Sequence, residues 1–214
     1  MADVLPVNFP IPSESLVNYD FTDLLTGVGY INLYCTQDEA NAYIVSRLAV
    51  AAAHDNYETR KAAAGGAYIS QELEFDYTMP INQLIKGDLF VTCTHNIHVA
   101  AADAGVGYIK CRIYHYDGST ETEIGTQQST TEIGGSPADF YSRDLFKFSV
   151  NKKFVVGDIL RINFELWINS ANGNTYCSLF HDGISRDFGQ EDPTSVPVGS
   201  NILVQVPFDM RGKL

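Results

Sequence analysis

Apolar and polar residues alternate along several stretches of the chain, most clearly in FVVGDILRINFELWI, residues 154–168. After Gly157 and Asp158, every second residue from 160 to 168 is apolar, and the residues between them are polar except Trp167. A period of two is typical of a half-buried strand. Gly157 permits a tight turn into this strand, and Asp158 can accept local backbone hydrogen bonds. We therefore expect residues 158–169 to form a central wall of the core.

The same pattern recurs after a second Gly-Asp pair in LIKGDLFVTCTHNIHV, residues 84–99, and less strictly elsewhere. Glycine, asparagine, aspartate or proline separates neighbouring segments, and a regular spacing of about 10 to 15 residues predicts an all-β sandwich or barrel. The predicted strands are 28–35, 41–49, 67–78, 87–99, 106–117, 120–133, 142–150, 158–169, 174–181 and 200–208.

The first residues follow a different pattern. Residues 1–16 contain three prolines among scattered apolar side chains, which predicts an extended N-terminal arm. We expect residues 17–214 to form one domain.

Three segments carry turn signals. Asp117-Gly118 and Asn172-Gly173 each predict a two-residue hairpin, because both residues of such a turn tolerate positive φ. Residues 49–66 end in a glycine pair and could form a short helix, although a loop with one helical turn is the preferred interpretation.

Composition narrows the possible partners. Twelve Tyr and twelve Phe favour sheet structure. A net charge of -12, with only 14 Lys and Arg, argues against nucleic acid or an anionic membrane as the partner. The chain has no run of about 18 apolar residues, and its first residues lack the features of a secretion signal. We therefore expect synthesis in a cytosol.

Cysteine and histidine side chains form the first candidate for chemistry. Cys93 and His95 share the apolar face of one predicted strand, and Cys111 and His115 share that of the next. A hairpin turning near residue 103 would bring the four together, as a zinc site or with a Cys93–Cys111 disulfide. Ordinary core contacts are the favoured interpretation, because buried thiols and imidazoles commonly need no metal. We expect no cofactor.

Carboxylates form the second candidate. Glu72, Glu74 and Asp76 alternate with apolar residues in QELEFDYTM and so share one face. They could bind calcium or act as paired acids, but a solvated outer face is the simpler interpretation. A basic neighbouring subunit or a cation would then have to neutralise their mutual repulsion.

The segment LFHDGISRDFGQEDP, residues 179–193, is dense in polar groups. Ser178 and Ser185 lie near His181 and Asp182, yet no nucleophile elbow surrounds them. We interpret the segment as a loop with salt bridges that forms an interface or an ion site, and we expect the protein not to be an enzyme.

Aromatic side chains point outward according to the alternation. Trp167, Tyr108, Tyr114 and Tyr116 fall on the face opposite the apolar residues, which is typical of protein interfaces and of sugar-binding platforms. A loop or the arm could equally cover them. The candidate interface residues are Phe9, Pro10, Tyr114, Tyr116, Trp167, His181, Asp182 and Arg186.

Several segments together resemble jelly-roll virion proteins of tailed bacteriophages, especially marine ones. The segments are NYDFTDLLTGVGYINLY, KGDLFVT, YSRDLFKFSVNKKFVVGDILRINFELWI, HDG and ILVQVPFDM. The resemblance implies an antiparallel β-sandwich of jelly-roll type with about ten strands. It also implies a place in the virion as a head decoration, head fibre or spike, often as a homotrimer bound to the major capsid protein. Proteins that look related often have His-Asp-Pro where this chain has His181-Asp182-Gly183.

Two functional hypotheses follow. A virion structural protein would dock on the capsid or on sister subunits through its arm and outward aromatic residues. A carbohydrate-binding or host-receptor-binding module would instead stack sugars, such as a host surface glycan, on Trp167 and the tyrosines. The missing secretion signal and the absence of an attached catalytic domain favour the virion. An enzyme, with a cupin-like metal site or as a glycosidase, ranks third, because cupin sheets carry tighter His-x-His and Glu spacing than Cys93-Thr94-His95 offers.

Overall fold

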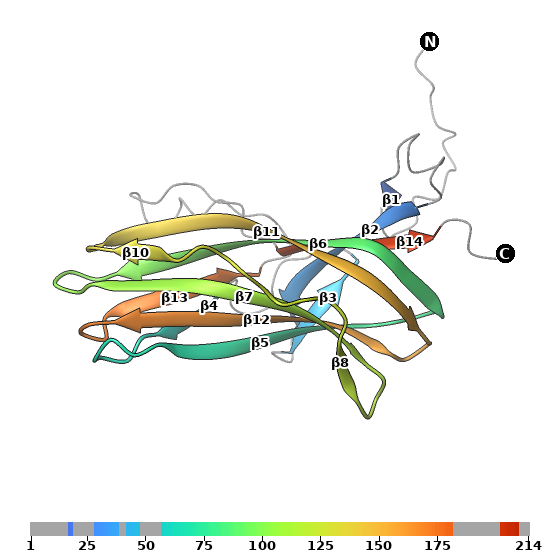
Figure 1. The fold of residues 1–214 in the computed structure, drawn as a ribbon, viewed down its shortest axis with the longest axis horizontal. Helices are drawn as coiled ribbons and strands as arrows, with labels where there is room; N and C mark the ends of the chain where they lie inside the picture. The colour runs from blue at the N-terminus through green and yellow to red at the C-terminus, as the bar shows by residue number, and fades with distance from the viewer. Residues whose placement is uncertain (1–16, 19–27, 39–41, 48–56, 182–201, 210–214) are drawn as a thin grey trace, which may run out of the picture.

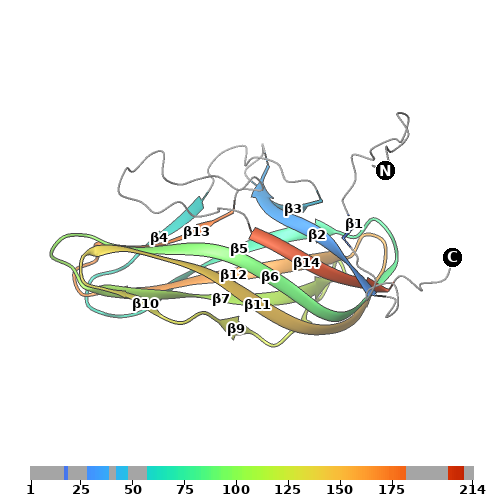
Figure 2. The same ribbon diagram turned by 90° about the horizontal axis from the view of Figure 1, so that it is seen from above.

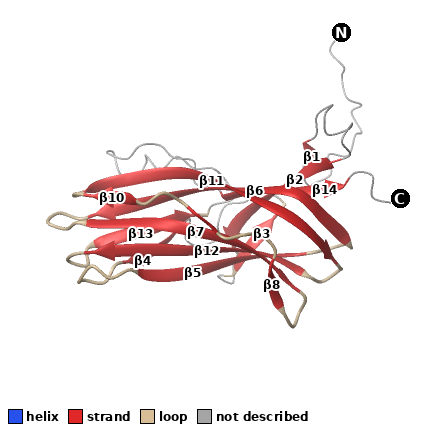
Figure 3. Ribbon diagram, in the orientation of Figure 1, coloured by secondary structure: helices blue, strands red, loops and turns tan. Residues whose placement is uncertain are grey.

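The structure is a computed structural model that describes residues 17–18, 28–38, 42–47, 57–181 and 202–209. These residues form fourteen strands and no helix (Figure 3), and thus contain no helix long and apolar enough to span a membrane. The strands are β1 Val17–Asn18, β2 Val28–Gln37, β3 Tyr43–Ser46, β4 Tyr57–Lys61, β5 Ile69–Thr78, β6 Gln83–Val99, β7 Gly105–Tyr116, β8 Glu121–Glu123, β9 Gln128–Ser129, β10 Ile133–Gly135, β11 Ala138–Phe154, β12 Ile159–Ser170, β13 Thr175–Phe180 and β14 Ile202–Asp209.

Hydrogen bonds join the strands in the order β10-β7-β12-β5-β3-β2-β14-β6-β13-β4, with β11 on the other edge of β6. Every pairing is antiparallel except β3 with β5. The sheet curves so strongly that β5, β12 and β7 lie across from β6, β11 and β13 (Figures 1 and 2). Phe146 of β11 and Phe164 of β12 meet across this space, with ring centroids 6.5 Å apart. The core therefore lies between the two groups of strands.

Alternation in β12 determines which of its side chains enter that core. Leu160, Ile162, Phe164, Leu166 and Ile168 are all fully buried. This arrangement confirms the predicted face of the strand.

Each of the ten predicted strands overlaps an observed strand. The observed strands differ from the prediction in two places. The predicted strand 120–133 is broken into β8, β9 and β10, each paired with β7. Residues 57–61, expected in a helix or loop, form β4, because they pair with β13 at the edge of the sheet. The predicted arm, residues 1–16, lies outside the described residues.

The first turn signal is confirmed as a hairpin, although the turn is longer than two residues. Tyr116 pairs with Glu121, and Asp117 accepts hydrogen bonds from the backbone amides of Ser119 at 2.9 Å and Thr120 at 2.7 Å. Gly118 has a φ of +89°. The carboxylate of Asp117 thus stabilises a wider turn, and these bonds lower its pKa to about 2.

The second predicted hairpin is wrong, and so is the hairpin expected near residue 103. Strand β13 pairs with β6 and β4 rather than with β12, and β6 does not pair with β7. At both places the chain crosses the core to the opposite group of strands. Local turn residues favour a reversal but do not determine which strand the chain meets afterwards.

Asp103 holds these two crossings together. Its side chain is 6% exposed. It accepts hydrogen bonds from Ser170 Oγ at 2.5 Å, Thr175 Oγ1 at 3.0 Å, and the amides of Ala104 at 2.8 Å, Asn172 at 3.0 Å and Asn174 at 2.8 Å. The bond from Ser170, followed by the backbone bonds, holds the pKa of Asp103 well below its usual range. One carboxylate therefore joins the β6–β7 and β12–β13 connections.

Strand β11 pairs with β6 over its whole length of 17 residues. On its other edge, the carboxamide of Gln128 accepts a hydrogen bond from the backbone amide of Lys147 at 3.2 Å and donates one to the Lys147 carbonyl. A side chain thus bonds to the backbone where a strand partner would lie.

Candidate interaction surface

The outer face of β5, β12 and β7 carries polar and aromatic side chains in register. The opposed pairs of β12 and β7 are Trp167 with Tyr108, Glu165 with Lys110, Asn163 with Arg112, and Arg161 with Tyr114. Each pair lies one rung further along the two strands. The strand alternation that buries Phe164 and its neighbours turns all these side chains outward.

An aromatic platform, defined as Tyr68, Tyr108 and Trp167, lies at one end of this face. The rings of Tyr108 and Trp167 are parallel within 6°, and their centroids are 6.0 Å apart. Tyr68 packs edge-on against Tyr108 at 5.7 Å and is 40% exposed. The platform combines partly exposed ring faces with a fixed mutual orientation.

Charged groups hold the platform in place. The indole Nε1 of Trp167 donates to Glu165 Oε2 at 2.7 Å, and Arg112 Nη2 lies 2.9 Å from Glu165 Oε1. Lys110 Nζ is 4.1 Å from the Trp167 ring centroid. Glu165 is buried and ion-paired with Arg112, so its side chain cannot rotate freely. Its hydrogen bond therefore holds the indole of Trp167 in one orientation.

The remaining ring is anchored in a similar way. The hydroxyl of Tyr68 donates to Glu132. Partial burial, together with this carboxylate, raises the pKa of Tyr68 to about 12.

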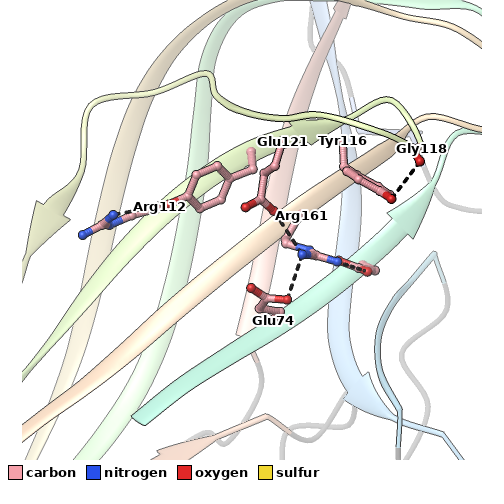
Figure 4. A network of polar contacts seen from close by, with 8 residues as sticks. Glu74, Arg112, Tyr116, Gly118, Glu121 and Arg161 are labelled. Atoms are coloured by element: carbon pink, nitrogen blue, oxygen red, sulfur yellow. Dashed lines mark hydrogen bonds and ion pairs between the residues drawn. The ribbon is translucent and has the colours of Figure 1, made fainter. Parts of the chain in front are cut away.

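Arg161 neutralises the acidic row of β5 (Figure 4). Its Nε and Nη2 bind Asp76 at 2.7 and 2.8 Å, and its Nη1 lies 2.8 Å from Glu74 and 3.0 Å from Glu121. The bond to Asp76 is the main cause that raises the pKa of Arg161. The same chain therefore supplies a positive charge to Glu74 and Asp76 of the row.

Two predicted interface residues belong to the same network. Tyr116 donates to the Gly118 carbonyl at 2.9 Å and lies 5.8 Å from the Arg161 guanidinium, and Tyr114 accepts from Arg112 at 3.2 Å. Both are partly exposed on the outer face, as Trp167 is, which agrees with their predicted orientation.

A second surface was missed by sequence reasoning. Ile81, Leu84, Val155 and Val156, which we call the end patch, are large apolar side chains with exposed fractions between 41% and 63%. They lie where β5 passes into β6 and β11 into β12, and the Val156 amide donates to Asn82 at 2.9 Å. Two consecutive valines after a strand were a usable signal, because adjacent residues of a strand cannot both face the core.

The four residues that could have formed a zinc set, Cys93, His95, Cys111 and His115, are not gathered into a metal site in the described residues. His115 Nε2 lies 2.7 Å from Asp158 Oδ2, whereas His95 Nδ1 lies 3.0 Å from Asp144 Oδ2. The second contact lacks the alignment of a hydrogen bond. Within the described ranges, no three His, Cys, Asp or Glu side chains are arranged to hold a metal ion.

The thiols are all free and buried. Cys93 and Cys111 face the core from opposite groups of strands and form no disulfide. Burial raises the pKa of both thiols well above the usual value. They are core residues in this structure.

The remaining interface candidates lie elsewhere. His181, expected on a surface loop, is fully buried, with its ring 5.5 Å from Tyr43 and 5.7 Å from Phe75, because β13 carries it into the core. Phe9, Pro10, Asp182 and Arg186 lie outside the described residues.

Comparison with known proteins gives distant likenesses. No protein-family model matches the sequence, and no curated protein matches it. A CocE/NonD family hydrolase from Staphylococcus aureus aligns with a TM-score of 0.42 and 8% identity over 84% of this chain and 37% of that chain. The structure of infectious bursal disease virus, Gx strain, aligns with a TM-score of 0.26 and 12% identity over 75% of this chain and 37% of that chain. This chain thus spans little more than a third of either protein, and scores this low do not establish a function.

Proposed function

We propose that the protein is a non-enzymatic structural protein of a virion, a jelly roll that assembles with other copies of itself and docks on capsid proteins. The end patch carries this proposal. Its apolar side chains come from two turns that are joined by backbone contacts, such as the Gly157 amide to the Met79 carbonyl at 3.0 Å. A group of exposed apolar residues with a polar rim is typical of a protein contact.

The charges around the patch favour a second copy of the chain as its occupant. Lys153 pairs with Leu84 of the patch, Lys152 precedes it, and Lys86 lies two residues further along β6. The whole chain carries a net charge of -12, so a cationic rim attracts another copy. Residues of opposite charge at the rim orient such a contact while the apolar centre stabilises it.

Strand β1 lies near the same end of the molecule as the patch. Strand β1 pairs with β2 at Tyr30 and Ile31, and Tyr30 pairs with Pro207 of β14. A methyl group at Gly87, near the start of β6, would lie only 3.4 Å from Pro207.

The jelly-roll fold is supported by the two groups of antiparallel strands that face each other across one core. Of the segments that carry the resemblance to phage virion proteins, KGDLFVT lies in the long strand β6, and YSRDLFKFSVNKKFVVGDILRINFELWI runs through β11 and β12. Their role is architectural, which agrees with a protein whose task is assembly.

Native mass spectrometry at micromolar concentration tests the assembly. We expect a homotrimer of bare chains. A chain carrying Ile81→Asp and Val156→Asp should be a folded monomer by circular dichroism, because two carboxylates would have to be buried in the contact. The control Leu145→Asp alters an equally exposed residue away from the patch and should remain a trimer. A monomeric wild type, or a trimeric double variant, would overturn the proposed contact.

Electron microscopy tests the location. An antibody against the protein should label virus particles in infected cells that produce it. Label confined to host structures would contradict the virion role even if the protein forms trimers.

A further inference from the structure

We infer that the aromatic platform binds carbohydrate, specifically a neutral oligosaccharide chain, with one pyranose ring lying on Tyr108 and Trp167. This inference does not depend on the virion proposal, because the platform consists of residues of a single chain.

The platform has the geometry that such a ligand requires. A pyranose presents a face of C–H groups that packs on an aromatic ring, and its hydroxyls project from the edge. The rings of Tyr108 and Trp167 are parallel and both side chains are partly exposed, so a pyranose can pack against them. Because the Trp167 indole is bonded to Glu165, little side-chain freedom would be lost on binding.

Hydrogen-bonding groups surround the rings. Glu132 lies beside Tyr68, and Lys110 and Arg112 occupy the next two rungs of β7. The two acidic side chains that touch the platform residues, Glu132 and Glu165, are matched by these two cations. The balance of charge favours a neutral sugar over an anionic one.

Two buried polar atoms on the third rung have no partner in the described structure. They are Arg112 Nε, a donor, and Asn163 Oδ1, an acceptor, on residues directly opposite each other. Asn163 is only 4% exposed. A buried polar atom without a hydrogen bond is costly, so a ligand with both hydroxyl donors and acceptors that reached this rung would be stabilised there.

The distance between these features indicates a chain of sugars. Successive rungs on one face are two residues apart, so the third rung lies about 13 Å from the Trp167 rung. A single pyranose cannot contact both places, whereas an oligosaccharide that follows the strands can.

A protein partner fits this surface less well. The centres of protein interfaces are depleted in charged residues, whereas the platform has Glu165, Lys110 and Arg112 immediately beside its rings. The end patch, which contains only aliphatic side chains, shows the contrast within the same molecule. The patch and the platform are also far apart, since the extended strand from Ile159 to Trp167 alone spans about 26 Å. A sugar could therefore bind while the patch is occupied.

The fluorescence of Trp167 reports directly on this site, because it is the only tryptophan of the chain. We would screen the protein on a printed array of neutral oligosaccharides and titrate the best-retained glycan in solution. Binding should change the intensity and wavelength of the Trp167 emission. Tyr108→Ala should weaken binding about tenfold or more, equivalent to about 1.4 kcal/mol.

A matched control is Tyr116→Ala, which removes a tyrosine from the same strand and the same face but far from the platform. It should leave the affinity unchanged. Retention of no glycan on the array would overturn the inference, as would equal affinities of wild type and Tyr108→Ala. The titration with the monomeric Ile81→Asp, Val156→Asp chain separates this result from the assembly proposal, since binding at a single chain should persist there.

Discussion

His115 Nε2 lies 2.7 Å from Oδ2 of Asp158, and each residue is only 6% exposed. The same carboxylate oxygen accepts from the Val155 amide at 2.9 Å. The His115 bond, followed by that of Val155, lowers the pKa of Asp158. The pair thus joins the end of β7 to the turn between β11 and β12, which is also the turn that carries half of the end patch.

Replacing Asp158 with Asn should destabilise the fold, because a carboxamide cannot accept both hydrogen bonds with the strength of a carboxylate. Asp88, the other Gly-Asp aspartate, provides the control, since it lies on the surface and binds Lys147 at 2.7 Å. We expect Asp158→Asn to lower the midpoint of urea unfolding at least twice as much as Asp88→Asn. Equal losses would show that the buried pair contributes no more than a surface one.

Acid should weaken the fold through carboxylates with lowered pKa values. Asp103, Asp117 and Asp158 have folded-state pKa values below the usual value near 4. Between the lowered pKa values of the folded state and the usual value near 4, the unfolded chain therefore binds more protons than the folded chain. The stabilisation that these three carboxylates contribute is present above about pH 4 and is lost as the pH falls towards 2. Urea unfolding measured from pH 6 to pH 2 should show this loss. The Asp103→Asn chain should have a shallower acid limb, and an unchanged limb would contradict the assigned hydrogen bonds.

The sequence predicted which side chains point into the core better than it predicted which strands lie next to each other. Alternation correctly placed Phe164 inside and Trp167 outside, because it depends only on the local geometry of a strand. The path at Asn172-Gly173 was wrong because Asp103, some 70 residues earlier, joins two crossings there. No local pattern encodes that contact.

In the candidate site, too, the direction of side chains was predictable and the contacts between distant strands were not. The outward faces of Tyr114 and Tyr116 were predicted, but the neutralisation of Glu74 and Asp76 by Arg161 was not. That ion pair depends on the register of β12 against β5, which opposes residues 85 positions apart. Pairing of the strands, and not the composition of either one, places the guanidinium.

Phe164→Ala should cost about 3 to 5 kcal/mol of unfolding free energy, because a fully buried ring would leave a cavity between Phe75 and Phe146. Chemical denaturation measures the change. Leu145→Ala, at a residue that is 64% exposed, should change the free energy by less than about 0.5 kcal/mol. A loss below about 1 kcal/mol for Phe164→Ala would show that the ring is not part of the core.

Arg161→Gln should destabilise the outer face by about 1 to 2 kcal/mol at low salt, since Glu74, Asp76 and Glu121 would lose their shared cation. Partial exposure of these carboxylates limits the effect. Salt should reduce the difference between variant and wild type, because it screens repulsion among the three carboxylates. Unfolding curves at two ionic strengths provide the measurement. If the loss of unfolding free energy in Arg161→Gln is the same at both, lost packing rather than lost charge is its cause.

The four cysteines should not react in the folded protein. Burial raises the pKa of each thiol, and only a thiolate reacts readily. A chromogenic disulfide reagent at pH 8 should therefore release no colour from the native protein and four equivalents after denaturation. Rapid reaction of one thiol in the native state would place that cysteine at the surface.

The bond between Gln128 and Lys147 has a consequence for how copies of this protein can join. An unprotected edge strand lets another chain extend the sheet without limit, which leads to fibres and aggregates. The Gln128 carboxamide uses up the amide and carbonyl of Lys147 near the middle of β11, so a foreign strand could not pair along the whole edge. Continuous extension of the sheet along the β11 edge is therefore disfavoured, and copies that meet at this edge would have to join through side chains, where symmetry can close the assembly at a fixed number of subunits.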